Sequence, residues 1–317
     1  MKRSKPWIAM GVCVLWAFLI PMSWSEEGSV MHKESGKVVR SAHGAGRWFP
    51  GRASELKEMV DGYIAQANVP EIKGVIVGAF APHAGYLYSG AMAGYTFRAI
   101  KDNAAKGHTP DTVVVLGLSH RGGFSGVALM SGDAIETPLG QSPLDAKAGE
   151  FLADQSPRIF FDYAPHAGEH SAENEIPFVQ AALPGVKMVV GLMGDHGADT
   201  IGELVSALDA LNKKERLLVI ASTDMLHDPD YDLVTNTDQK TLEMVARMDA
   251  DGLAREWQPS KQIFCGIAPV LATMRFAEDQ GCRKGTILGY RNSGDDFPES
   301  RGRWVVGYGA VVFAVPE

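Results

Sequence analysis

Four of the five apolar runs in this sequence are followed at once by a histidine. The pairs of run and polar residue are Lys73–Phe80 with His83, Thr112–Leu118 with His120, Lys187–Met193 with Asp195 and His196, and Arg216–Ser222 with Asp224 and His227. Imidazole and carboxylate groups bind metal ions and transfer protons, so a group of them in one place could do either. One histidine after a strand is more often an ordinary loop residue, and only the set as a whole favours a functional site.

The segments around these residues predict the elements that must position them. The fifth apolar run is Trp304–Val315, and the segments with apolar residues at three- and four-residue spacing are Ala53–Ala67, Ser89–Asp102, Ala172–Leu183, Thr200–Leu211 and Asp238–Trp257. Apolar runs that alternate with helices indicate a three-layer α/β domain around a central mixed, largely parallel sheet. Ligands bind such sheets beyond the carboxyl ends of the strands, which is where the histidines follow.

A further polar group lies in the stretch APHAGEHSAENEIPF, which contains His166, His170, Ser171 and Glu173. Ser171 is expected to cap the following helix, its hydroxyl accepting a free backbone N–H of the first turn. Glu173 and Glu175 are most simply explained as acidic residues that complement the helix dipole. This stretch therefore predicts a helix start rather than a site.

Cys265 lies between an apolar stretch and a glycine, ahead of a helix of small residues. Three interpretations are compatible with this position. The thiol could be inert and buried, it could pair with Cys282 in an oxidising compartment, or it could join the histidines as a thiolate ligand. The spacing does not decide among them, because no CxxC or HExxH motif is present.

The N-terminal segment has the layout of a secretory signal peptide, with a basic start, a short apolar stretch and small residues ahead of Glu26. We expect residues 1–25 to be removed on export to the periplasm or the extracellular space, with an uncleaved membrane anchor as the alternative. Residues 26–38 are polar and predict a tether. Residues 39–317 predict one domain.

Removing the signal peptide leaves 27 basic against 38 acidic side chains, a net charge of −11 compared with −8 for the whole chain. An acidic protein of this kind is not attracted to nucleic acid or to an anionic membrane surface. We therefore expect no nucleic acid partner and no membrane span in the mature chain. The expected partner is a small-molecule or peptide ligand at the strand ends.

Seven short motifs occur in a fixed order along the chain: APHAGYLYSG, GLSH, ETPLG, EHSAENEIPF, ASTDMLH, FCGIAPVL and VGYGAVVF. In this order and approximate spacing they resemble the MEMO family, whose bacterial members are called AmmeMemoRadiSam system protein B. The resemblance runs from about Val39 to the end of the chain. That family resembles the catalytic subunits of class III, non-haem-iron extradiol dioxygenases, which implies a mixed sheet between helices.

The resemblance also implies a site. Matched residue by residue, it makes His83, His120 and Cys265 metal ligands, and it places Asp224 and His227 in the same pocket as catalytic residues. Three protein ligands leave coordination positions open. Imidazole and thiolate together favour iron or copper, with zinc possible. In such a site an exposed thiolate is open to oxidation.

Two classes of function follow from the resemblance. The first is a metal-dependent, dioxygenase-like oxidoreductase. The alternative is a non-catalytic copper- or iron-binding protein, or a module that binds a peptide or a protein. The bacterial family name further implies a functional link to a radical-SAM protein.

Overall fold

The computed structural model of the protein describes residues 31–34 and 36–316 of the 317-residue chain. The predicted signal peptide, residues 1–25, lies outside the described residues. Within the part that is described, no helix combines the length and the apolar character needed to cross a membrane.

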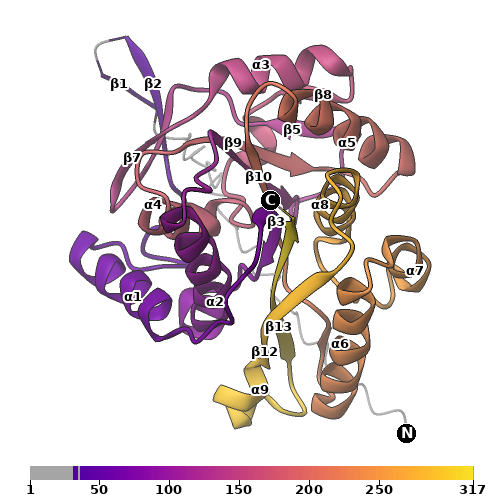
Figure 1. The fold of residues 1–317 in the computed structure, drawn as a ribbon. Helices are drawn as coiled ribbons and strands as arrows, with labels where there is room; N and C mark the ends of the chain where they lie inside the picture. Colours follow the sequence, from indigo (N-terminus) through magenta and orange to yellow (C-terminus); the bar gives the residue numbers. More distant parts are fainter. Residues whose placement is uncertain (1–30, 35, 317) are drawn as a thin grey trace, which may run out of the picture.

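A nine-stranded mixed sheet forms the centre of the protein (Figure 1). In spatial order its strands are β11 (His227–Asp228), β13 (Val305–Val315), β3 (Val75–Ala81), β10 (Leu217–Ser222), β4 (Thr112–Leu118), β9 (Lys187–Met193), β5 (Val127–Leu129) and β8 (Ile159–Phe161), and β12 (Gly285–Asn292) also pairs with β13. The neighbours β3, β10, β4 and β9 run parallel. In contrast, β13 is antiparallel to β3, and β5 is antiparallel to β9. The sheet is therefore mixed with a parallel centre.

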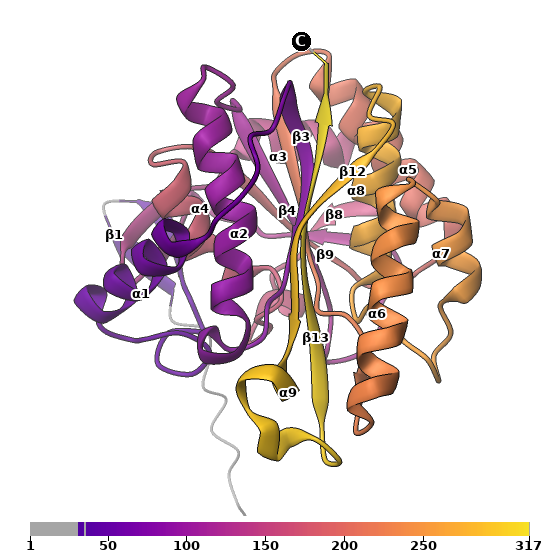
Figure 2. The same cartoon turned by 60° about the horizontal axis from the view of Figure 1, so that its bottom comes forward.

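Helices cover both faces of this sheet (Figure 2). One face carries α1 (Ala53–Gln66), α2 (Tyr86–Ala105) and α4 (Ile176–Ala182), and the other carries α3 (Ala146–Gln155), α5 (Ala198–Asn212), α6 (Tyr231–Ala246), α7 (Ala250–Glu256) and α8 (Ile267–Asp279). Side chains along β4 alternate between the two cores, with Val113 and Val115 in one and Val114 and Leu116 in the other. Both faces of the strands are buried, which explains the unbroken apolar runs. The predicted three-layer α/β class is confirmed.

A second, four-stranded sheet lies beside the first. Its strands in order are β1 (Met31–Glu34), β2 (Lys37–Ser41), β6 (Ala134–Thr137) and β7 (Gly140–Pro143). Because β1 and β2 pair antiparallel, part of the predicted tether is strand. These strands are too short for a period to stand out in the sequence, and we did not predict them.

The predicted helix Asp238–Trp257 is wrong in its extent. The structure has two helices there, α6 and α7, and Met248 between them has a φ of +59°. Asp249 begins α7 by accepting a backbone N–H of its first turn at 2.8 Å. Asp230 caps α6 in the same way and moves its start to Tyr231. Apolar spacing continues across the break, so the pattern alone did not reveal it.

Candidate metal centre

Strand order brings the predicted site residues together. The strands β3, β10 and β4 are parallel neighbours, so His83, Asp224 and His120, which follow them, meet at one edge of the sheet. Cys265 joins them from the segment before α8. The ligand atoms of His83, His120 and Cys265 lie within 4.8 Å of one another, and so do those of Asp224, His227 and Cys265. We call these five residues the rim cluster.

His83 and Cys265 form the buried side of the rim cluster. His83 Nε2 lies 3.4 Å from Cys265 Sγ and 3.9 Å from Asp224 Oδ2. Asp224 fixes both neighbours. Its Oδ1 accepts the His83 backbone N–H at 2.9 Å, its own N–H donates to Cys265 Sγ at 3.2 Å, and its carbonyl accepts the Cys265 N–H at 3.1 Å. The loops after β3 and before α8 are therefore held together by the loop after β10.

Burial sets the protonation of these groups. It lowers the pKa of His83 well below the usual value, and the nearby His120 and His170 rings add to this. It raises the pKa of Asp224 to about 7, against backbone hydrogen bonds that lower it. Burial and the Asp224 carboxyl raise the pKa of the Cys265 thiol to about 12. Without a cation the site therefore holds a neutral imidazole and a neutral thiol, because burial disfavours the charged form of both.

The expectation of an exposed Cys265 thiolate is wrong. The Cys265 residue is only 8% exposed, and Cys282 is fully buried. Both are free thiols, so the structure does not contain the disulfide that was one of the three interpretations. The backbone N–H of Asp224 donates to Cys265 Sγ and holds the thiol in the site, away from solvent.

We expect a thiol reagent such as Ellman's to detect neither Cys265 nor Cys282 in the folded, metal-free chain of residues 26–317. Both should react after unfolding in guanidinium chloride, because burial and a high pKa each suppress thiolate reactivity. The measurement is the absorbance released before and after unfolding. Rapid reaction of one native thiol, assigned with Cys282→Ser, would contradict the buried geometry.

Glu169 orients His120 and was not among the predicted site residues. Glu169 is 3% exposed, its Oε2 accepts the His120 backbone N–H at 2.7 Å, and its Oε1 lies 2.9 Å from His120 Nδ1. The backbone N–H groups of His170 and Ser171 donate to the same oxygen. Burial would raise the pKa of Glu169, but His120 and the backbone donors lower it to about 2. The ionised carboxylate therefore accepts the Nδ1–H of His120, which leaves Nε2 free to bind a metal.

We expect Glu169→Gln to weaken metal binding by about 10- to 100-fold, the usual cost of losing a carboxylate that orients a histidine ligand. The amide keeps the size of the side chain but loses the negative charge that accepts the Nδ1–H of His120. Titration with Co²⁺, followed by thiolate-to-metal absorbance, measures the affinity. Glu203→Gln, which changes a carboxylate on α5, is the matched control. Equal affinity of Glu169→Gln and wild type would rule out this role.

His170 also lies at the site, although its stretch of sequence predicted only a helix start. Its ring lies between those of Trp48 and His120, with centroid distances of 3.8 and 4.7 Å and interplanar angles of 4° and 16°. Burial and the His120 ring lower the pKa of His170 to about 4, so it is neutral at neutral pH. The sequence did contain a signal for this site, because His170 directly follows Glu169, but we interpreted that stretch as a helix start.

The roles predicted for Ser171 and the glutamates after it are wrong. Ser171 does not cap a helix. Its hydroxyl donates to the Leu118 carbonyl at 2.7 Å and accepts the Leu118 N–H at 3.1 Å, so it closes the end of β4. Glu173 accepts a backbone N–H from residue 44 at 2.7 Å, and burial raises its pKa to about 8. Glu175 is fully buried. The loop over residues 42–49 covers this turn, so the glutamates do not face solvent as dipole-complementing residues do.

His196 lies outside the rim cluster although it also follows a parallel strand. His196 follows β9, which neighbours β4 but lies three strand spacings, about 14 Å, from β3. The His196 ring instead lies 4.6 Å from that of Trp257. Asp195 accepts the Gly197 N–H at 2.8 Å at the start of α5. This fourth strand end therefore serves local structure.

His227 does belong to the rim cluster. It begins β11, and its ring lies 5.8 Å from that of Trp304. Its Nε2 is buried and has no hydrogen-bond partner in the described part of the chain. Burial, with a contribution from His120, lowers the pKa of His227 to about 4. A buried, neutral imidazole nitrogen without a partner is suited to a ligand that supplies a proton or a cation.

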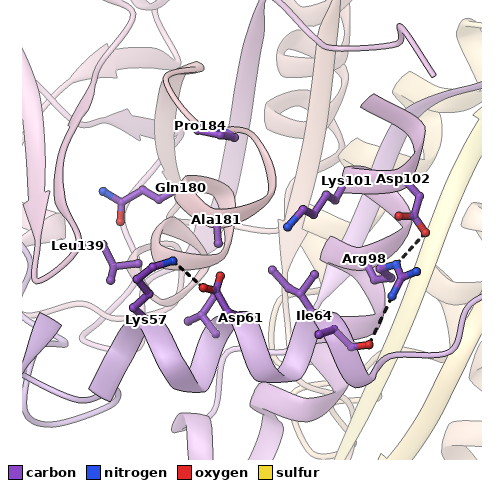
Figure 3. A pocket seen from close by; sticks show the side chains of 12 residues that line it. Lys57, Asp61, Ile64, Arg98, Lys101, Asp102, Leu139, Gln180, Ala181 and Pro184 are labelled. Carbon is purple, nitrogen blue, oxygen red and sulfur yellow. Dashed lines mark hydrogen bonds and ion pairs between the residues drawn. The ribbon is translucent and has the colours of Figure 1, made fainter. Parts of the chain in front are cut away.

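A surface pocket of about 740 Å³ lies between α1, α2 and α4 (Figure 3) and shares no residue with the rim cluster. Two ion pairs line it, Lys57 with Asp61 at 2.6 Å and Arg98 with Asp102 at 2.8 Å. Surface pairs of this kind contribute little free energy. Its lining side chains do not converge on one point as those of the rim cluster do, so we place the candidate site at the strand ends.

The chain is similar to known proteins over nearly the whole length of those proteins. A family model described as "Memo-like protein" matches residues 40–312. The MEMO1 family protein of Methanopyrus kandleri is 32% identical over 87% of this chain and 99% of its own length. Those of Nitrosopumilus maritimus and Ignicoccus hospitalis are 29% and 30% identical over 87% and 88% of this chain and all of their own lengths. A crystal structure of an uncharacterized protein from Escherichia coli K12 is 15% identical with a TM-score of 0.45, covering 73% of this chain and 99% of that chain.

Proposed function

This chain belongs to the Memo-like protein family, and we propose that its rim cluster is a metal-binding site. His83 and His120 would bind the ion through Nε2, and Cys265 would bind it as a thiolate. Iron or copper suits this donor set, and zinc is possible. When bound, such an ion supplies a Lewis acid, and in the case of iron or copper also a carrier of electrons.

The observation that carries the proposal is the convergence of three ligand atoms from distant segments of the chain. Protein groups already hold Nδ1 of both histidines, Ser222 at 3.0 Å from His83 and Glu169 at 2.9 Å from His120. His83 Nε2 lies 3.4 Å from Cys265 Sγ, and the ligand atom of His120 lies within 4.8 Å of those of the other two residues. Because Glu169 holds Nδ1 of His120, Nε2 is the nitrogen left to bind an ion. Three ligand atoms this close together could bind one ion and leave coordination positions open for a further ligand.

Asp224 and His227 would act on whatever binds at the open positions. The pKa of Asp224, which burial raises to about 7, allows its carboxyl to hold or release a proton near neutral pH. His227 offers a buried, neutral nitrogen as an acceptor. In a dioxygenase-like oxidoreductase these two groups would orient a polar substrate and move its proton. We propose a small molecule or a peptide as that ligand.

A specific observation favours the second candidate, a protein that holds copper or iron without turnover. Non-haem iron oxygenases usually bind iron through two histidines and a carboxylate, whereas here a buried cysteine completes the set. A soft, solvent-shielded thiolate retains Cu(I) tightly. Stable Cu(I) binding without O₂ consumption would select this candidate over the oxidoreductase.

The test is the metal content of residues 26–317 purified without oxygen. We expect near-stoichiometric iron or copper in the wild type and its loss in both His83→Ala and Cys265→Ser. The matched controls are His196→Ala and Cys282→Ser, which change the same residue types outside the rim cluster and should keep the metal. A wild type without metal after incubation with Fe(II), Cu(I) and Zn(II), or variants that keep it, would refute the site.

Two further proposals concern the cellular compartment and the functional partner of the protein. We propose that the chain is exported after removal of residues 1–25, and that it works in the same process as a radical-SAM protein. Fractionation of cells that express the tagged full chain, with mass determination of the mature N-terminus, tests the first of these. Recovery of the uncut chain from the cytoplasm would refute export and would make direct contact with a cytoplasmic enzyme possible.

A further inference from the structure

Glu175 is a buried acid that the proposed site does not use. It lies in the turn before α4 and is 0% exposed. Its Oε1 is 2.7 Å from Ser222 Oγ, and its Oε2 has no partner among the described residues. A buried carboxylate with one unpaired oxygen is costly, so this carboxyl group requires an explanation.

The contacts of Ser222 determine which group donates each proton. Its Oγ contacts three polar atoms, the Ser171 carbonyl oxygen, Glu175 Oε1 at 2.7 Å and His83 Nδ1 at 3.0 Å. A hydroxyl has one proton to donate and two lone pairs that accept. The Ser171 carbonyl can only accept, so its contact with Ser222 Oγ is a hydrogen bond only if the Ser222 proton points to it.

Both remaining neighbours of the Ser222 hydroxyl must then be donors. Glu175 can donate only as a neutral carboxylic acid, and His83 can donate only with its proton on Nδ1. Burial acts in the same direction, since it raises the pKa of Glu175 well above the usual value. In neutral Glu175 the unpaired Oε2 is an uncharged carbonyl oxygen. Burying it without a partner costs less free energy than burying an unpaired carboxylate oxygen.

We propose that Glu175 is a positioning residue, which as a neutral carboxylic acid donates a hydrogen bond to Ser222 and so fixes His83 in the Nδ1–H tautomer. That tautomer leaves the lone pair of Nε2 directed at the space shared with Cys265 Sγ at 3.4 Å and Asp224 Oδ2 at 3.9 Å. The significance of the tautomer for metal binding rests on the proposed function, whereas the tautomer itself does not.

The two histidines of the site are thus oriented in different ways. An ionised carboxylate, Glu169, holds His120, whereas a neutral acid acts on His83 through a hydroxyl. Only the first arrangement adds negative charge next to a ligand. A site with one charged and one neutral orienting group carries less negative charge than one with two carboxylates.

The test uses the metal-free protein and the isosteric variant Glu175→Gln. We expect the infrared difference spectrum between wild type and this variant at neutral pH to contain the C=O band of a protonated carboxyl group. Nitrogen NMR of the imidazoles, with His83 assigned from its loss in His83→Gln, should show the Nδ1–H tautomer. Carboxylate bands in the difference spectrum, or an Nε2–H tautomer of His83, would overturn the proposal.

Variants separate positioning from simple support of the fold. The Glu175→Gln amide can still donate to Ser222, so it should keep the Nδ1–H tautomer and bind Co²⁺ within a few-fold of wild type. Glu175→Met removes the group that donates to Ser222, and Ser222→Ala removes the hydroxyl between Glu175 and His83. Both variants should lose the preference for the Nδ1–H tautomer of His83 and should bind Co²⁺ about 10- to 100-fold more weakly than wild type. An unchanged tautomer in both folded variants would refute the positioning role.

The outcomes also distinguish this inference from the metal-site proposal. A protonated Glu175 and the expected tautomer in a protein that binds no metal would refute only the metal site. Metal binding by a protein whose Glu175 is ionised would refute only the positioning role.

Discussion

The Cys265→Asp variant is expected to lose at least about 100-fold in affinity for Cu(I) while keeping Fe(II) binding within about tenfold of wild type. Thiolate is a soft ligand that selects Cu(I), whereas a carboxylate with two histidines forms the set that Fe(II) oxygenases use. The structure places Cys265 Sγ 3.4 Å from His83 Nε2, so a carboxylate at this position can reach the same ion. Competition with a coloured Cu(I) chelator and anaerobic Fe(II) titration measure the two affinities.

The Cys282→Asp variant is the control, because this cysteine is also buried but lies in the core beside α8. It is expected to destabilise the fold without changing the ratio of the two affinities. Circular dichroism of both variants separates unfolding from a change in metal preference. Equal losses of Cu(I) and Fe(II) in Cys265→Asp would indicate that the sulfur does not select the metal.

The second large effect concerns Asp238, a fully buried residue of α6. Its Oδ1 accepts the Leu226 N–H at 3.1 Å, and its Oδ2 accepts the Tyr290 hydroxyl at 2.9 Å. Burial raises the pKa of Asp238 from 3.8 to about 7, against these two hydrogen bonds that lower it. The folded protein therefore binds a proton that the unfolded chain has released, and stability is lost as the pH rises from about 4 to about 7.

We expect Asp238→Asn to remove this loss. The free energy of unfolding of the variant, relative to wild type, should increase between pH 4 and pH 8 by about 4 kcal/mol, from the shift at 1.36 kcal/mol per pKa unit. Guanidinium unfolding at several pH values measures it. Asp61→Asn, on the exposed face of α1, should give a difference that does not depend on pH in this way. Parallel stability curves for wild type and Asp238→Asn would contradict the prediction.

Much of the fold could be predicted because the central strands are buried on both faces. The runs Thr112–Leu118 and Lys187–Met193 match β4 and β9 to the residue. The short strands β5 and β8 have three residues each, and the break at Met248 depends on one left-handed residue, so neither leaves a periodic pattern. A periodic sequence pattern shows that one face of a helix or strand is buried over several residues. It does not reveal strands of two or three residues.

The site could be predicted in part for the same reason. His83, His120 and Asp224 were found because parallel strands end at one edge of the sheet. Cys265 was chosen by resemblance alone. Glu169 and Glu175 were missed because the loops that bury them have no period, and a buried glutamate cannot be told from an exposed one without those loops.

The place of β13 in the sheet has a consequence for the synthesis of the chain. Both partners of β3 come much later in the sequence, β10 from Leu217 and β13 from Val305. The strand β13, made long after β3, thus pairs with the side of β3 that faces away from β10. At about 5–20 residues per second the ribosome needs roughly 10–45 s to travel from β3 to β13. During that time an apolar strand, Val75–Ala81, has an unpaired edge, and a factor that shields nascent chains would protect it from pairing with another copy.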